Sequence, residues 1–111
     1  MKKIIKKLEK AGIGIHNYKE KEKLCGYELN TYTAGGLNQI VFVDFRDIDK
    51  DPKNPVDFKE LLLGRINDID VDEEVEMNRQ NKAYRQAFTL TESLKDINAW
   101  KKDLLKLAKS L

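Results

Sequence analysis

The chain has 111 residues, of which 41% are hydrophobic and 36% are charged. This length predicts a single domain spanning residues 1–111, and the periodic apolar residues exclude a disordered chain. The single cysteine, Cys25, excludes an intrachain disulfide, and no apolar run approaches the ~18 residues that a membrane span needs. The first residues lack the apolar core of a signal peptide, so we expect a cytoplasmic protein that does not bind membranes.

The net charge is only +2, yet the charges are strongly segregated along the chain. Residues 1–24 carry eight lysines against three glutamates. Residues 44–76 carry five basic against twelve acidic groups, and residues 77–111 carry eight basic against three acidic groups. Such a chain is expected to have a dipolar surface, which suits docking to a charged partner.

Residues 2–11 predict a short amphipathic helix, because apolar residues recur at helical spacing and lysines take the other faces. The apolar residues of this stripe are Ile4, Ile5, Leu8 and Ala11. Gly12 then favours the end of the helix. Over residues 13–18, isoleucine alternates with glycine and histidine, so a short additional strand in this segment is an alternative.

Residues 25–33 and 38–46 predict an antiparallel β-hairpin. Apolar and polar side chains alternate with period two in the first segment. Gly35 and Gly36, which tolerate a positive φ, supply the turn between the segments. The second segment is apolar on both faces at its centre, so we expect it to be the more buried of the two strands.

Two helices are predicted after the hairpin. Asn54 is a suitable N-cap, and Pro55 follows it at the first helical position, which indicates a helix over residues 55–69. Asp70, with a glutamate three residues later, indicates a second start and a short helix over residues 71–78. Residues 79–88 are basic and polar, and we expect a loop or a frayed turn there.

The last predicted helix begins with a capping box, Thr89-x-x-Glu92, and extends over residues 90–110. Its apolar residues step by four and three positions. They are Leu90, Leu94, Ile97, Trp100, Leu104, Leu107 and Leu111. The expected order is α-β-β-α-α, an α+β fold in which a small antiparallel hairpin sheet is packed by an N-terminal helix and two or three further helices.

Six carboxylates close together in sequence are the candidate partner-binding residues. They are Asp68, Asp70, Asp72, Glu73, Glu74 and Glu76. An EF-hand loop begun at Asp68 or at Asp47 would lack the glycine at its sixth position and the glutamate at its twelfth. Helix capping explains part of the cluster without a metal. A third interpretation is mimicry, in which the carboxylates occupy a partner groove that is meant for phosphates.

No motif in the chain predicts catalysis. His16 and Cys25 could form a nucleophile and its base, but no third group is evident to orient them. The glycine pairs lack the remaining residues of a nucleotide-binding loop. We therefore expect no enzyme activity, no cofactor and no metal.

Basic residues near the C-terminus predict an alternative function, the binding of nucleic-acid phosphates. They are Arg85, Lys101, Lys102 and Lys106. Phe42-Val-Asp-Phe45 also matches the tail of the RNA-recognition sheet motif, although the glycine and the aromatic residue that should precede it are absent. Lysines at such positions are more often the solvated face of an amphipathic helix, and the acidic middle of the chain argues against an extended nucleic-acid footprint.

Three segments, Tyr32-Thr-Ala-Gly-Gly36, Ile69–Met77 and Leu94–Ala108, carry a resemblance that covers about residues 27–111. Together they resemble a group of small, mostly uncharacterised proteins encoded by phages and mobile elements of Gram-positive bacteria. The resemblance implies no site residues. It does imply a phage-encoded role, in which small non-enzymatic proteins bind and block a host defence complex such as a CRISPR effector.

The sequence therefore favours a non-enzymatic protein that inhibits or modulates a host protein or ribonucleoprotein complex through its acidic patch. Nucleic-acid binding by the basic C-terminal helix is the alternative. Formation of a homodimer is a further alternative, because Leu105 and Ala108 widen the apolar stripe of the last helix beyond what one small sheet covers.

Overall fold

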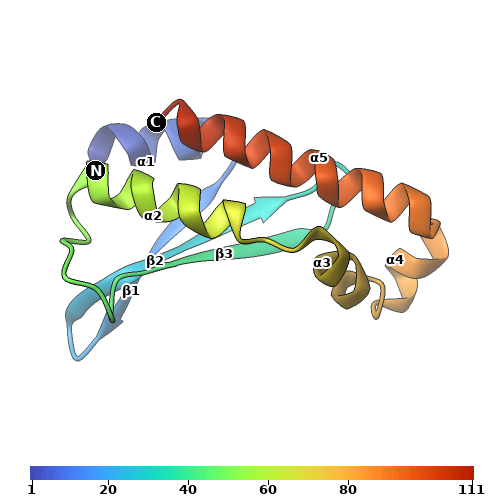
Figure 1. Ribbon diagram of the computed structural model, residues 1–111, viewed down its shortest axis with the longest axis horizontal. Coiled ribbons are helices and arrows are strands. Elements are labelled where there is room, and N and C mark those ends of the chain that lie inside the picture. The colour runs from blue at the N-terminus through green and yellow to red at the C-terminus, as the bar shows by residue number, and fades with distance from the viewer.

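A three-stranded antiparallel sheet lies beneath a layer of helices in the computed structural model, which describes all 111 residues (Figure 1). The elements are α1 (Lys2–Lys10), β1 (Gly14–Glu20), β2 (Lys23–Tyr32), β3 (Asn38–Asp44), α2 (Pro55–Asn67), α3 (Val71–Asn78), α4 (Lys82–Ala87) and α5 (Leu90–Lys109). The predicted α+β fold is confirmed, and the additional strand that the sequence left open is present as β1.

The expectation that residues 38–46 form the more buried strand is wrong. The sheet order is β1-β2-β3, so β2 is central and β3 is an edge strand. Helices cover only one face of the sheet, as Figure 1 shows, and the side chain of Ile40 on the other face is 60% exposed. Apolar side chains on both faces of residues 38–46 therefore do not mean that both faces are buried. Here the helices cover one face of the antiparallel sheet, and the other face is exposed to solvent.

The core lies between the inner face of the sheet and the helices α1, α2 and α5, and Val75 of α3 is also buried in it. On the sheet, Leu29 is paired with Val41 on one side and with Ile15 on the other, which places these side chains in one row. The helices contribute residues that are buried at helical spacing. These are Ile4 and Leu8 of α1, Phe58, Leu62 and Ile66 of α2, and Ile97, Trp100, Leu104 and Ala108 of α5.

The predicted helix starts are confirmed at three places. The Asn54 side chain accepts hydrogen bonds from two backbone N–H groups at the start of α2. Asp70 accepts one from the Glu73 N–H at the start of α3. At α5 the capping box is complete, because Thr89 and Glu92 each accept a hydrogen bond from the backbone of the other. Each cap satisfies an N–H group that the helix itself cannot pair.

The expectation of a loop or frayed turn at residues 79–88 is wrong, because the structure has α4 there. Asn81 caps this short helix by accepting a hydrogen bond from the Tyr84 N–H. Tyr84 is buried, and its ring lies 4.8 Å from that of Phe88. The two aromatic residues and the cap stabilise a helical turn that the polar composition of the segment concealed.

One polar contact joins the sheet to α5 inside the core. The indole N–H of Trp100 donates to the hydroxyl oxygen of Thr31 at 2.8 Å, and that hydroxyl donates to the Gln39 carbonyl oxygen at 2.6 Å. All three residues are buried. The Thr31 hydroxyl therefore satisfies its donor and an acceptor site, and it links β2, β3 and α5.

Gly26 of β2 lies in close contact with the backbone of β3. The pairing of β1 with β2 shifts between Tyr18 and Lys19, which leaves Cys25 between two paired positions as a β-bulge. A Cβ on Gly26 would overlap with the backbone carbonyl oxygen of Val43. Since that oxygen belongs to the backbone of β3, it cannot move aside as a flexible side chain would.

We expect Gly26→Ala to lower the free energy of unfolding by about 1–3 kcal/mol or more, because the strands must separate to admit the methyl group. Gly64→Ala is the matched control, since a Cβ at that position in α2 meets nothing within 4 Å. The control should raise stability by roughly 0.5–1 kcal/mol, because glycine is a poor helix former. Urea denaturation followed by circular dichroism measures both, and an unchanged midpoint for Gly26→Ala would contradict the close approach.

Candidate interaction surfaces

The six candidate carboxylates surround the junction of α2 and α3, and we refer to residues 68–76 as the acidic segment. Asp68 follows the last residue of α2, and Asp70 is the N-cap of α3. The other four lie on α3, where only Glu74 is half-buried and the rest are exposed. Carboxylates in the first turn of α3 also interact favourably with the positive end of the helix dipole.

None of these carboxylates forms an ion pair within the protein. The four ion pairs of the structure all involve Arg46 or Lys50, whose partners are Glu20, Asp44, Asp57 and Glu60. Nor is any group of three or more His, Cys, Asp or Glu side chains placed to hold a metal ion. No carboxylate of the acidic segment is therefore neutralised by a direct ion pair, and all six except Glu74 are exposed.

The backbone of the acidic segment is held by a lysine from α5. The Lys101 ammonium donates to the carbonyl oxygen of Ile69 at 2.6 Å and to that of Asn67 at 3.4 Å. These carbonyls lie at the C-terminal end of α2 and just beyond it, where a cation is favourable. Lys101 therefore has a structural role that its place in a basic helix did not indicate.

The structure does not bring the four candidate nucleic-acid residues together. Arg85 lies on α4, where its guanidinium donates to the Arg79 carbonyl oxygen at 3.1 Å. It lines a hollow that it shares with Asp72 and Glu76 of the acidic segment. Lys101 is turned toward the α2–α3 junction, so of the four candidates only Lys102 and Lys106 are exposed on α5.

The two residues that could have formed a nucleophile and its base are also apart. His16 is exposed on β1 and is paired with Glu28, whereas Cys25 is buried on β2. The Cys25 thiol donates to the Lys23 carbonyl oxygen at 3.3 Å. Cys25 thus acts as a small buried residue at the bulge.

An apolar hollow of about 370 Å³ lies between α5, the end of β2 and the link from α1 to β1. Its lining includes Ile13, Trp100, Leu104 and Leu107, and Asp103 is the single charged residue there. A small-molecule site usually combines an apolar lining with several convergent polar groups. This hollow has the size of such a site but not its set of polar groups.

A charged and aromatic cluster on the open face of the sheet was missed in the sequence. Arg46 pairs with Asp44 at 2.7 Å and with Glu20 at 2.9 Å. Its guanidinium also lies 5.2 Å from the ring centre of Tyr18 and 5.8 Å from that of Phe42. The spacing of Asp44 and Arg46, two residues apart at the end of a strand, was the only available signal.

Comparisons of this chain with protein-family models, with curated proteins and with solved structures find no match. No helix is both long enough and apolar enough to cross a membrane.

The hydrogen bonds from Arg46 lower the pKa of Asp44 below its usual value of 3.8. A carboxylate with a depressed pKa stabilises the folded protein at any pH above its unfolded pKa, and this contribution is lost as the pH falls through the folded pKa. We therefore expect Asp44→Asn to lower the melting temperature at pH 7, and the difference from wild type to shrink as the pH falls below the ordinary pKa of an aspartate, about 3.9.

Thermal unfolding at pH 7, 4 and 3 measures this difference. Asp68→Asn is the control, because Asp68 is exposed and has no ion-pair partner. A difference for Asp44→Asn that stays constant between pH 7 and pH 3 would show that the carboxylate charge is not responsible.

Proposed function

We propose that this protein is a non-catalytic, cytoplasmic binding protein that inhibits or modulates a host macromolecular complex. The acidic segment would dock on a positively charged surface of that complex. The observation that carries the proposal is the set of six carboxylates that have no ion pair, on a backbone that Lys101 holds in place. Unpaired charge on a fixed backbone can meet a partner with little loss of conformational entropy.

The chemistry of the partner follows from the charge. A row of carboxylates attracts lysine and arginine side chains, and a protein surface rich in them is typical of a groove that holds nucleic-acid phosphates. Occupation of that groove would exclude the nucleic acid. The resemblance to phage and mobile-element proteins makes a host defence complex, including a CRISPR effector, the partner class that we propose.

A test of the acidic segment reverses the charge of exposed residues and leaves the N-cap Asp70 intact. We expect Asp72→Lys, Glu73→Lys and Glu76→Lys together to abolish retention of the partner from nuclease-treated bacterial lysate. Each reversal near the start of α3 changes the helix-dipole interaction by roughly 0.3–1 kcal/mol. For the two reversals in the first turn, Asp72 and Glu73, this amounts to roughly 0.6–2 kcal/mol, so the melting temperature should fall by about 3–12 °C.

The matched control carries the same change of charge elsewhere, as Glu22→Lys, Asp47→Lys and Asp49→Lys, all at exposed positions outside the helices and strands. The control should retain the proteins that wild type retains. If the acidic-segment variant holds the same proteins at the same salt concentration, the acidic segment is not the docking surface.

A further inference from the structure

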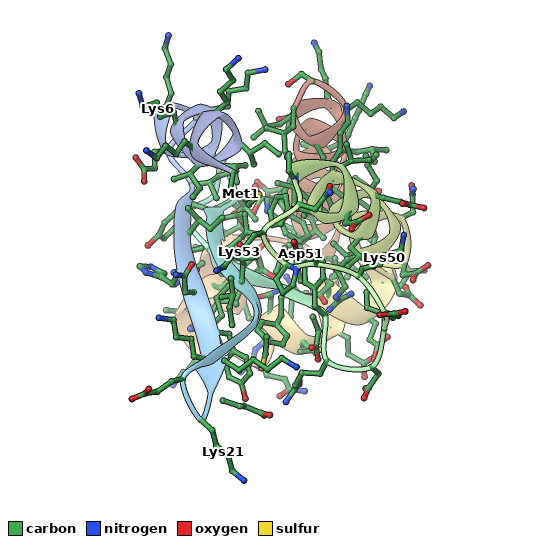
Figure 2. The ribbon with its side chains drawn as sticks, turned by 90° about the vertical axis from the view of Figure 1, so that its left-hand side faces the viewer. Met1, Lys6, Lys21, Lys50, Asp51 and Lys53 are labelled. Atoms are coloured by element: carbon green, nitrogen blue, oxygen red, sulfur yellow. The ribbon has the colours of Figure 1, made fainter.

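The fold brings two basic segments together that lie at opposite ends of the sequence. Helix α1 lies beside the C-terminal half of α5 in both views (Figures 1 and 2). The Lys7 ammonium donates to the carbonyl oxygen of Ser110 at 3.3 Å, which connects the two segments directly. A surface that spans both helices therefore exists only in the folded protein.

Each helix contributes one row of lysines to this surface. On α1, Lys3, Lys7 and Lys10 are separated by four and three residues and so share one face. Because Lys7 contacts Ser110, that face is turned toward α5. On α5 the same spacing repeats. The basic ridge, as we call this surface, consists of Lys3, Lys7, Lys10, Lys102, Lys106 and Lys109.

The charge of the basic ridge is not neutralised within the protein. All six lysines are exposed, and none takes part in an ion pair. Two further exposed lysines of α1, Lys2 and Lys6, add to it. The carboxylates on these parts of the two helices are Glu9 and Asp103, and neither pairs with a lysine. The charge of the basic ridge is therefore available to an external anion.

We propose that the basic ridge binds the phosphate backbone of a nucleic-acid duplex, without reading its sequence. Three positions separated by seven residues span about 10 Å along a helix. A duplex presents roughly one negative charge per 1.7 Å of its axis, or about six over that length. The two rows of three lysines therefore carry about as many charges as a duplex presents over the same length.

The buried face of each helix argues against a membrane as the partner. A helix that lies on a bilayer inserts its apolar face between the lipids. Here the apolar faces of α1 and α5 are already inside the core, where Leu8 and Leu104 are buried. Insertion would require the protein to unfold.

The absence of aromatic residues from the basic ridge argues against a single strand. Proteins that bind single strands stack the bases on aromatic side chains. The Tyr18–Phe42 pair belongs to β1 and β3 and lies on the outer face of the sheet. The exposed Tyr32 is the last residue of β2 and lines the apolar hollow, so it is not one of the basic-ridge residues. The basic ridge offers contacts to phosphates alone.

The test measures the affinity for fluorescent 20-base-pair duplexes of RNA and of DNA by anisotropy, between 50 and 300 mM salt. With about six phosphate contacts, the logarithm of the association constant should fall with the logarithm of the salt concentration with a slope near −5. Two paired variants divide the surface. They are Lys3→Gln with Lys10→Gln on α1, and Lys106→Gln with Lys109→Gln on α5.

Each paired variant should weaken binding about tenfold and reduce the salt slope by about 2, because two phosphate contacts are lost. An equal effect of both pairs supports one surface shared by the two helices. The matched control is Lys19→Gln with Lys21→Gln. Lys21 lies in the β1–β2 turn, at the end of the molecule opposite Lys6 in Figure 2. This control should bind as wild type does.

Four results would overturn the proposal. They are no binding to either duplex at 50 mM salt, tighter binding to a single strand of equal length, equal binding to anionic phosphatidylserine vesicles, and equal weakening in the control. The comparison of RNA with DNA identifies the duplex that is preferred. The test is independent of the acidic segment, because the charge reversals there should not weaken duplex binding.

Discussion

The position of α5 across the inner face of the sheet is the constraint on which the rest of the structure depends. Its apolar stripe closes the core. The Trp100 indole N–H donates a hydrogen bond to the Thr31 hydroxyl, which in turn donates one to the backbone of β3. At 20 residues α5 reaches about 30 Å, most of the 42 Å length of the molecule. Asp96 on α5 accepts a hydrogen bond from the Gly35 N–H, so the helix also holds the β2–β3 turn.

The same helix positions both charged surfaces. Near its N-terminal end, the fully buried Ser93 accepts a hydrogen bond from Arg79, and this contact holds the end of α3. In its middle, Lys101 bonds to the backbone at the α2–α3 junction. At its C-terminal end the Ser110 carbonyl accepts a hydrogen bond from Lys7 of α1. The acidic segment and the basic ridge are thereby placed at different positions along one rigid helix.

Local signals in the sequence predicted the parts of the fold that depend on local physics. The caps at Asn54, Asp70 and Thr89 require only the few residues that follow them, and all three helix starts were predicted correctly. The burial of β3 depends on a third strand and on a helix layer far away in sequence, and there the prediction failed. The basic ridge depends in the same way on a long-range contact, between Lys7 and Ser110, so the lysines of α1 could not be assigned to the surface of α5. The acidic segment was visible because its six residues are neighbours in the chain.

Segregated charge is costly to the folded state, because like charges held close together repel one another. A fold in which α1 lay against the acidic segment would have relieved both surfaces with ion pairs. Instead α1 lies beside the C-terminal end of α5, which is also basic. Arg46 and Lys50 are the only cations that take part in ion pairs. The repulsion is left for external groups to relieve, cations at the acidic segment and anions at the basic ridge. A ribonucleoprotein offers both, since basic protein surfaces and duplex phosphates lie next to each other in it. The two proposals thus converge on one class of partner, although each is tested by its own residues.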